Sequence, residues 1–69
     1  RGKNVAVKAG ETSVTVAFPV EEANADYAVF VEQSWLGVRA IEKKDAKGFT
    51  IRFDKPAPDN ATLDWFIVR

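Results

Sequence analysis

Apolar and polar residues alternate with a period of two through most of this sequence, and this pattern constrains the fold more than any other feature. Residues 49–54 alternate strictly, and large apolar side chains occupy every second position of residues 4–8, 13–18 and 63–67. Successive side chains of a strand point to opposite faces, so each of these segments has one apolar face. No segment has the helical period of 3.6 residues. The sequence therefore predicts an all-β fold.

Turn signals divide the chain into six short strands. Gly10-Glu11, Pro19, Leu36-Gly37, the hairpin turn at residues 44–48 and the proline-containing loop at 55–60 separate them. The third strand is expected at residues 27–35 and the fourth at 37–43. Six strands at this spacing predict a six-stranded antiparallel β-sandwich, with a small barrel as the alternative. Residues of shared parity should form one core: Val14, Val16, Phe18, Val29, Val31, Phe49, Ile51, Phe53, Leu63, Trp65 and Ile67.

The chain has 69 residues and contains neither Cys nor His. We expect residues 1–69 to form a single β-sandwich domain, the C-terminal part of a longer chain. A domain of this size buries only about 60% of the surface that its unfolded chain exposes, so it usually needs an additional source of stability. Disulfides and a structural zinc site are excluded by composition. Unless the core alone suffices, oligomerisation is the remaining source.

The residue inventory argues against catalysis, and we predict that the protein is not an enzyme and needs no cofactor or metal. Neither Ser13 nor Ser34 has a His to activate it, and the four glycines are isolated, so no phosphate-binding loop is present. Ten basic and ten acidic residues give no net charge, which predicts no nucleic-acid partner. No apolar run approaches about 18 residues, which predicts no membrane insertion.

Two strands carry apolar residues on both faces, although a half-exposed antiparallel sheet should be polar on its outer face. We interpret this second face as a surface for self-association, with charged residues that can pair across a symmetric boundary. The alternative is that a barrel or a long loop covers these side chains within one chain. The predicted interface comprises Phe30, Glu32, Arg39, Ile41, Arg52, Asp64, Phe66 and Val68.

A second candidate site lies at the end of the third strand, where Trp35 has polar neighbours. An indole there can stack on the apolar face of a sugar while Gln33 or Arg39 binds its hydroxyl groups. The alternative is that Trp35 shares the parity of Tyr27 and Val29 and simply covers the core. If a ligand binds, we expect it to contact Trp35, Gln33 and Arg39.

The strand sequences Tyr27-Ala28-Val29-Phe30-Val31, Gly48-Phe49-Thr50-Ile51 and Asp64-Trp65-Phe66-Ile67-Val68-Arg69, together with Trp35, resemble H-type lectin-like C-terminal domains of bacterial and phage tail-fibre or surface proteins. The resemblance covers residues 12–69 and consists of core motifs. It implies a six-stranded sandwich that assembles as a homotrimer. None of the family's sugar-binding positions has a counterpart that can be matched residue by residue in this sequence.

These observations lead to two functional hypotheses. The first is a homotrimeric adhesion or receptor-binding module of a surface or virion protein, with a cell-surface glycan as its expected ligand. The second is a purely structural module for trimerisation or for capsid or filament decoration, without a small ligand. Both predict an extracellular, cell-surface or virion location.

Overall fold

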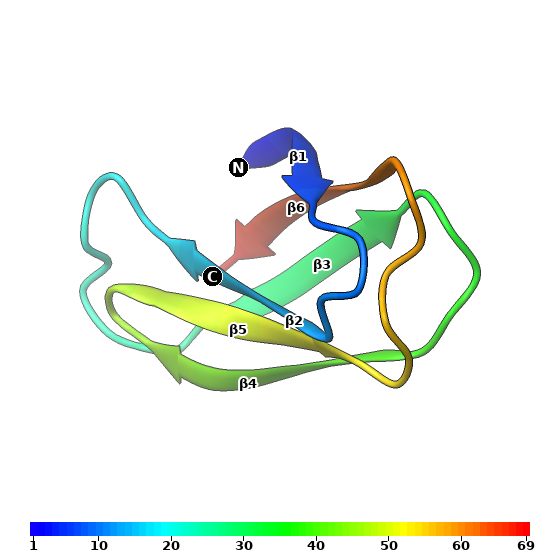
Figure 1. Ribbon diagram of the computed structural model, residues 1–69. Coiled ribbons are helices and arrows are strands. Elements are labelled where there is room, and N and C mark those ends of the chain that lie inside the picture. The colour runs from blue at the N-terminus through cyan, green and yellow to red at the C-terminus, as the bar shows by residue number, and fades with distance from the viewer.

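The computed structural model describes all residues 1–69 and contains six antiparallel strands and no helix, so the predicted all-β class is confirmed. None of its segments is therefore a helix that could cross a membrane. The strands, shown in Figure 1, are β1 (Gly2–Val7), β2 (Ser13–Ala17), β3 (Ala28–Gln33), β4 (Arg39–Asp45), β5 (Gly48–Phe53) and β6 (Ala61–Val68).

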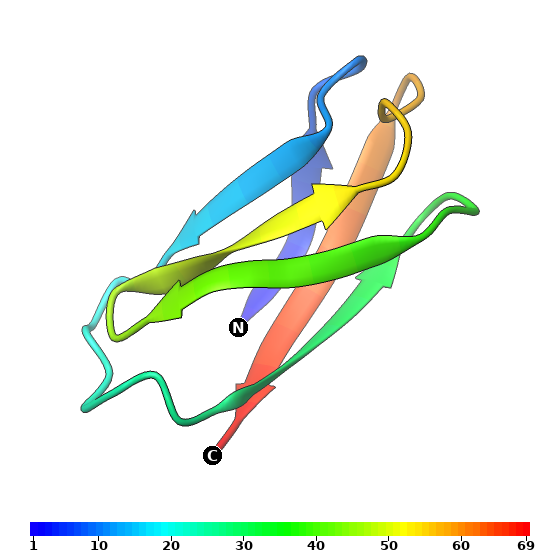
Figure 2. The ribbon, with the colours of Figure 1, turned by 90° about the horizontal axis from the view of Figure 1, so that it is seen from below.

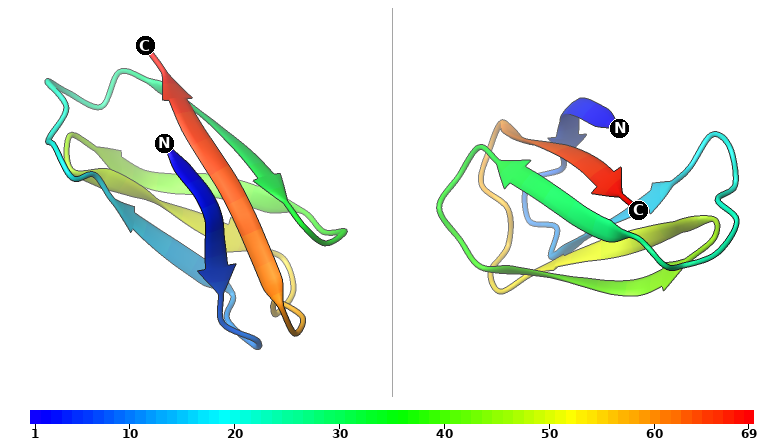
Figure 3. Two further views of the ribbon diagram at one scale, coloured as in Figure 1. Left: turned by 90° about the horizontal axis from the view of Figure 1, so that it is seen from above. Right: turned by 180° about the vertical axis from the view of Figure 1, so that it is seen from behind.

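The strands form two three-stranded sheets that face each other (Figure 2). Sheet A has the order β1-β6-β3, and sheet B has the order β2-β5-β4. Only the β4–β5 hairpin joins neighbours within one sheet; every other connection passes from one sheet to the other. The two sheets are thus tied together by the chain itself at both ends of the sandwich, as the views in Figure 3 show.

The boundaries of the third and fourth strands differ from the prediction. β3 ends at Gln33, two residues earlier than expected, and β4 begins at Arg39. The reason is the side chain of Gln33, whose amide nitrogen donates hydrogen bonds to the carbonyls of Trp35 and Gly37, at 3.2 Å each. These bonds bend the intervening residues into a tight loop.

The core lies between the two sheets and contains the residues that the alternation predicts. Six of the predicted core residues are buried: Val16, Phe49, Ile51, Phe53, Leu63 and Trp65. The other five are partly buried and pack against them: Val14, Phe18, Val29, Val31 and Ile67. The core also includes Val7, Tyr27, Ala57 and Ala61, so the first strand and the 55–60 loop contribute to it.

Aromatic side chains from both sheets meet in the centre of this core. The ring of Trp65 on β6 lies edge-on to Phe49 on β5, with centroids 5.4 Å apart. Phe18 contacts both Trp65, at 5.8 Å, and Tyr27, at 5.5 Å. Aromatic pairs at such offsets and tilts stabilise a core beyond their buried area. This cluster is therefore the main contact between the sheets.

Tyr27 also connects the two sheets by hydrogen bonds. It precedes β3, and its hydroxyl lies 2.7 Å from the carbonyl oxygen of Asp45 and 2.9 Å from that of Gly48, to which it donates. Burial is the main factor that raises the pKa of Tyr27, and the nearby negative charge of Asp45 adds to it. Its hydroxyl thus holds the β4–β5 hairpin against the edge of sheet A.

Candidate functional site

The outer face of sheet A carries an apolar patch that the rest of the chain leaves uncovered. Phe30 on β3 lies directly opposite Phe66 on β6, and their rings stack with centroids 5.1 Å apart and planes 13° from parallel. Phe30 is 50% exposed, Phe66 49% and Val68 49%. We call Phe30, Phe66 and Val68 the sheet A patch. Because β6 is the central strand of its sheet, the patch lies on the broad face of the sheet.

Charged residues surround one end of this patch. Glu32 lies directly opposite Asp64, so two carboxylates are neighbours on adjacent strands, an arrangement that is unfavourable without a cation. Arg1 and Lys3 line the same hollow of about 500 Å³ as these acids, Phe30 and Phe66. One oxygen of Asp64 also accepts a hydrogen bond of 2.7 Å from the backbone N–H of Asn4.

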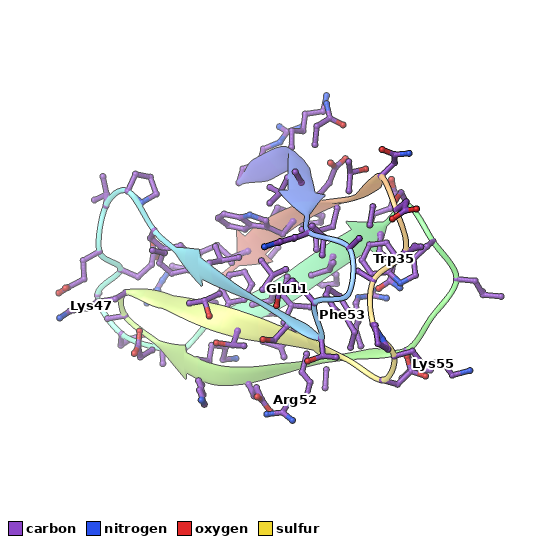
Figure 4. All side chains as sticks on the ribbon, viewed as in Figure 1. Glu11, Trp35, Lys47, Arg52, Phe53 and Lys55 are labelled. Carbon is purple, nitrogen blue, oxygen red and sulfur yellow. The ribbon has the colours of Figure 1, made fainter.

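The predicted interface is divided by the structure, and three of its members lie elsewhere. Ile41 pairs with Ile51 across the β4–β5 ladder and points into the core, which corrects its assignment to the outer face. Arg52 points away from the sandwich on the outer side of sheet B, where it forms an ion pair of 3.0 Å with Glu42 (Figure 4). Ile41 was misassigned because Arg39 and Lys43 share its parity, so β4 shows no clear apolar face. Arg52 was misassigned because parity within one strand does not say to which sheet that strand belongs.

Arg39 also lies off the outer face of sheet A, since its guanidinium donates to the carbonyl of Val31 at the edge of β3, at 2.6 Å. The basic residues that accompany Glu32 and Asp64 are instead Arg1 and Lys3. Neither residue was predicted from the sequence. The alternation of residues 4–8 was a signal, because it indicates that the residues before it continue along the same sheet.

The residues of the predicted ligand site are brought together at one end of the sandwich. The ring of Trp35 lies edge-on to Phe53, with centroids 5.0 Å apart, and is half-buried against the core (Figure 4). The amide nitrogen of Gln33 is already bonded to two loop carbonyls, and its oxygen lies 3.5 Å from Arg39. None of the surface hollows is lined by Trp35. Ligand binding by these three residues stays a prediction.

The same loop presents two apolar side chains that sequence reasoning overlooked. Leu36 is fully exposed and Val38 is 68% exposed. The loop is held from two sides, because the Gln33 amide binds it from β3 and Asp54 accepts a 3.2 Å hydrogen bond from the N–H of Val38. Leu36 and Val38 were placed in a turn and at a strand start, where an apolar residue without a partner is itself a signal.

No group of three or more acidic side chains in the structure is close enough to hold a metal ion. In comparisons with protein-family models, with curated proteins and with solved structures, no match to this chain is found. The resemblance to H-type lectin-like domains therefore stays a prediction, and the function must be argued from the surface.

Proposed function

We propose that this chain is a non-enzymatic assembly module in which copies of itself associate through the outer face of sheet A. The observation that carries the proposal is the stacked and half-exposed Phe30–Phe66 pair. An exposed apolar patch with a polar rim is typical of a contact between proteins. The small core of a 69-residue chain supports the same conclusion.

A second copy of the chain is the occupant that the charges of this face favour. Glu32 and Asp64 carry two negative charges, and Arg1 and Lys3 carry two positive charges around the same hollow. A face with both signs can match itself, because the acids of one copy can meet the bases of the next. The homotrimer is taken from the resemblance to H-type lectin-like domains, and with it the placement in a surface or virion protein.

Adhesion to a receptor is a second role of this module, and it is favoured by one observation. Leu36 and Val38 project from a loop that is held rigid by Gln33 and Asp54. Apolar side chains on a preorganised loop bind with little loss of conformational entropy. In this role Trp35 holds the loop against the core through its contact with Phe53. A cell-surface glycan is the alternative ligand, bound by Trp35, Gln33 and Arg39. Without it, the module is purely structural.

Sedimentation equilibrium of the wild-type chain and two variants tests the assembly. At micromolar concentration the wild type should sediment as a trimer or a multiple of a trimer, with a chain mass of 7.6 kDa. Phe66→Glu should lose the three-fold association, because a carboxylate would be placed in the centre of the contact. Val20→Glu is the matched control, since Val20 is 76% exposed in a different region. A monomeric wild type, or a Phe66→Glu variant that stays trimeric, would refute the proposal.

A glycan array, read with wild type and Trp35→Ala, tests the adhesive role. Binding that is lost in Trp35→Ala and retained in Val20→Glu supports the glycan. Binding to a protein receptor that is lost only in a Leu36→Asp variant supports the loop. The absence of both leaves the structural role.

A further inference from the structure

The sandwich has four edge strands, because each three-stranded sheet has two. The free edge of a strand presents N–H and C=O groups that can pair with a strand of another chain, and proteins block such edges with charges, bulges or covering side chains. In this molecule three of the four edges are blocked, two by charged side chains and one by irregular backbone. The fourth, β2, is not.

The edges of β3 and β4 are blocked by charged residues. Ser34 donates to the carbonyl of Thr62, so even-numbered residues of β3 bond to β6 and odd-numbered ones face the free edge. The outward carbonyl of Val31 accepts a bond from Arg39 of β4, and the carbonyl of Tyr27, which immediately precedes β3, accepts one from Lys44. β4 itself has the sequence RAIEKKD, with a register shift between Glu42 and Asp45.

The edge of β1 is blocked by irregular backbone. Its pairing with β6 shifts between Gly2 and Val5, and Asn4 has a φ of 52°, outside the strand region. The N–H of Asn4 donates to the side-chain carboxylate of Asp64 on β6, so it is not available to a strand of another chain. Only residues 5–7 remain in regular pairing, which is too short an edge to recruit another strand.

β2 has none of these devices. Its sequence is Ser-Val-Thr-Val-Ala, without charge or proline, and its five residues pair with β5 in unbroken register. The backbone groups of Thr12 and Phe18, which flank β2, bond to β5 and to the turn before it. By the alternation of an antiparallel ladder, the backbone groups of Val14 and Val16 also bond to β5. The backbone groups of Ser13, Thr15 and Ala17 therefore point to the free edge. Figures 2 and 3 show no segment alongside β2 on that side.

We propose that β2 pairs with β2 of a second copy, antiparallel and with Thr15 opposite Thr15, so that the two B sheets join into one six-stranded sheet. In this register Ser13 faces Ala17 of the second copy, and all three outward residues can exchange both of their hydrogen bonds. Centring the pair on Val16 instead would place Ser13 opposite Pro19, which has no N–H to donate.

The β2 strand of a second copy fits this edge better than any other strand of the chain does. The opposed side chains are small and uncharged, so the symmetric pair brings no like charges together. Because the other three edges are blocked, the pairing closes at two copies instead of continuing into a ribbon. The contact is separate from the sheet A patch, which lies on the other sheet, so both can operate in one assembly.

The test is made in the Phe66→Glu background, where the sheet A contact is absent. This chain should sediment at twice 7.6 kDa. Adding Thr15→Lys or Thr15→Glu should each give a monomer, because identical charges meet at the two-fold axis, and mixing the two should restore the dimer. Thr15→Val, which keeps the backbone groups and the shape, should remain dimeric.

Thr15→Pro provides a second variant that spares the fold. The N–H of Thr15 faces the free edge, so proline removes the central donor of the contact and no bond to β5. Circular dichroism confirms that each variant stays folded. A monomeric background chain, or charged variants that stay dimeric when alone, would overturn the β2 contact, and a mixture that stays monomeric would overturn the Thr15 pairing. None of these results alters the comparison between the wild type and Phe66→Glu that tests the sheet A contact.

Discussion

The indole of Trp65 lies against the backbone of Gly2, its partner across the β1–β6 ladder. A methyl group at Gly2 would overlap Nε1, Cδ1 and Cε2 of that indole. Trp65 is buried and packed edge-on to Phe49, so a shift of the ring would disturb that contact. The beginning of β1 therefore covers the aromatic cluster only because residue 2 has no side chain.

Gly2→Ala should therefore destabilise the domain by about 1–3 kcal/mol, the usual cost of overpacking a core. The cost has an upper limit, because β1 can separate from β6 near its beginning instead of straining the core. Urea unfolding followed by tryptophan fluorescence measures it. Lys8→Ala, at an exposed residue just after β1, should change the free energy of unfolding by less than about 0.5 kcal/mol. Equal effects of the two substitutions would show that Gly2 does not contact the ring.

Trp65→Ala should cost about 3–5 kcal/mol, since it removes the largest side chain of the aromatic cluster. That is a large part of the stability available to a domain of this length, roughly 3–10 kcal/mol. Trp35→Ala should cost clearly less, because Trp35 is only half-buried and contacts the core at its end. Thermal unfolding by circular dichroism compares the two, and a cooperatively folded Trp65→Ala variant with unchanged stability would contradict this account of the core.

The raised pKa of Tyr27 predicts a loss of stability in alkaline solution. Burial disfavours the phenolate, so the folded protein holds the proton to a higher pH than the unfolded chain, in which the pKa is about 10. The stabilisation is complete below the unfolded pKa and is lost as the pH rises above it toward the folded pKa. The free energy of unfolding should therefore fall above about pH 10.

Tyr27 is the single tyrosine of the chain, so the ultraviolet absorbance of the phenolate reports the ionisation of this one residue. In Tyr27→Phe the tyrosine contribution to the alkaline slope should disappear. The same variant should lose about 1–3 kcal/mol at neutral pH, because the carbonyls of Asp45 and Gly48 lose their donor. A Tyr27 that titrates at the normal pKa in the folded protein would show that its ring is accessible to water.

The fold could be predicted from the sequence because the information needed is local. Alternation places Val16, Phe49 and Leu63 on inward faces whatever the topology is. The division of the strands between two sheets depends on contacts between distant segments, and no pattern within a strand contains it. This is why Arg52, which lies on the outer face of sheet B, was assigned to the face of Phe66. Ile41 was misassigned for another reason, since Arg39 and Lys43 share its parity and obscure its inward direction. The side-chain hydrogen bonds of Gln33 and Arg39 could not be predicted from the sequence either, since they join residues across a bend.

The blocked edge of β3 gives the last prediction. Arg39 binds the outward carbonyl of Val31 on that edge and Lys44 binds the carbonyl of Tyr27 just before it, and removing both side chains would expose a second strand for pairing. A chain with two open edges, β2 and β3, can pair at both and form an unclosed ribbon instead of a finite assembly. The double variant Arg39→Ala and Lys44→Ala should therefore aggregate into β-rich material that binds an amyloid dye. Lys47→Ala with Lys55→Ala removes the same charge from two exposed lysines that point into solvent (Figure 4), and this control should stay soluble. Adding Thr15→Pro to the aggregating variant blocks the β2 edge, which leaves only β3 open, and should halt growth. If the double variant stays as soluble as its control, the two side chains do not protect the edge.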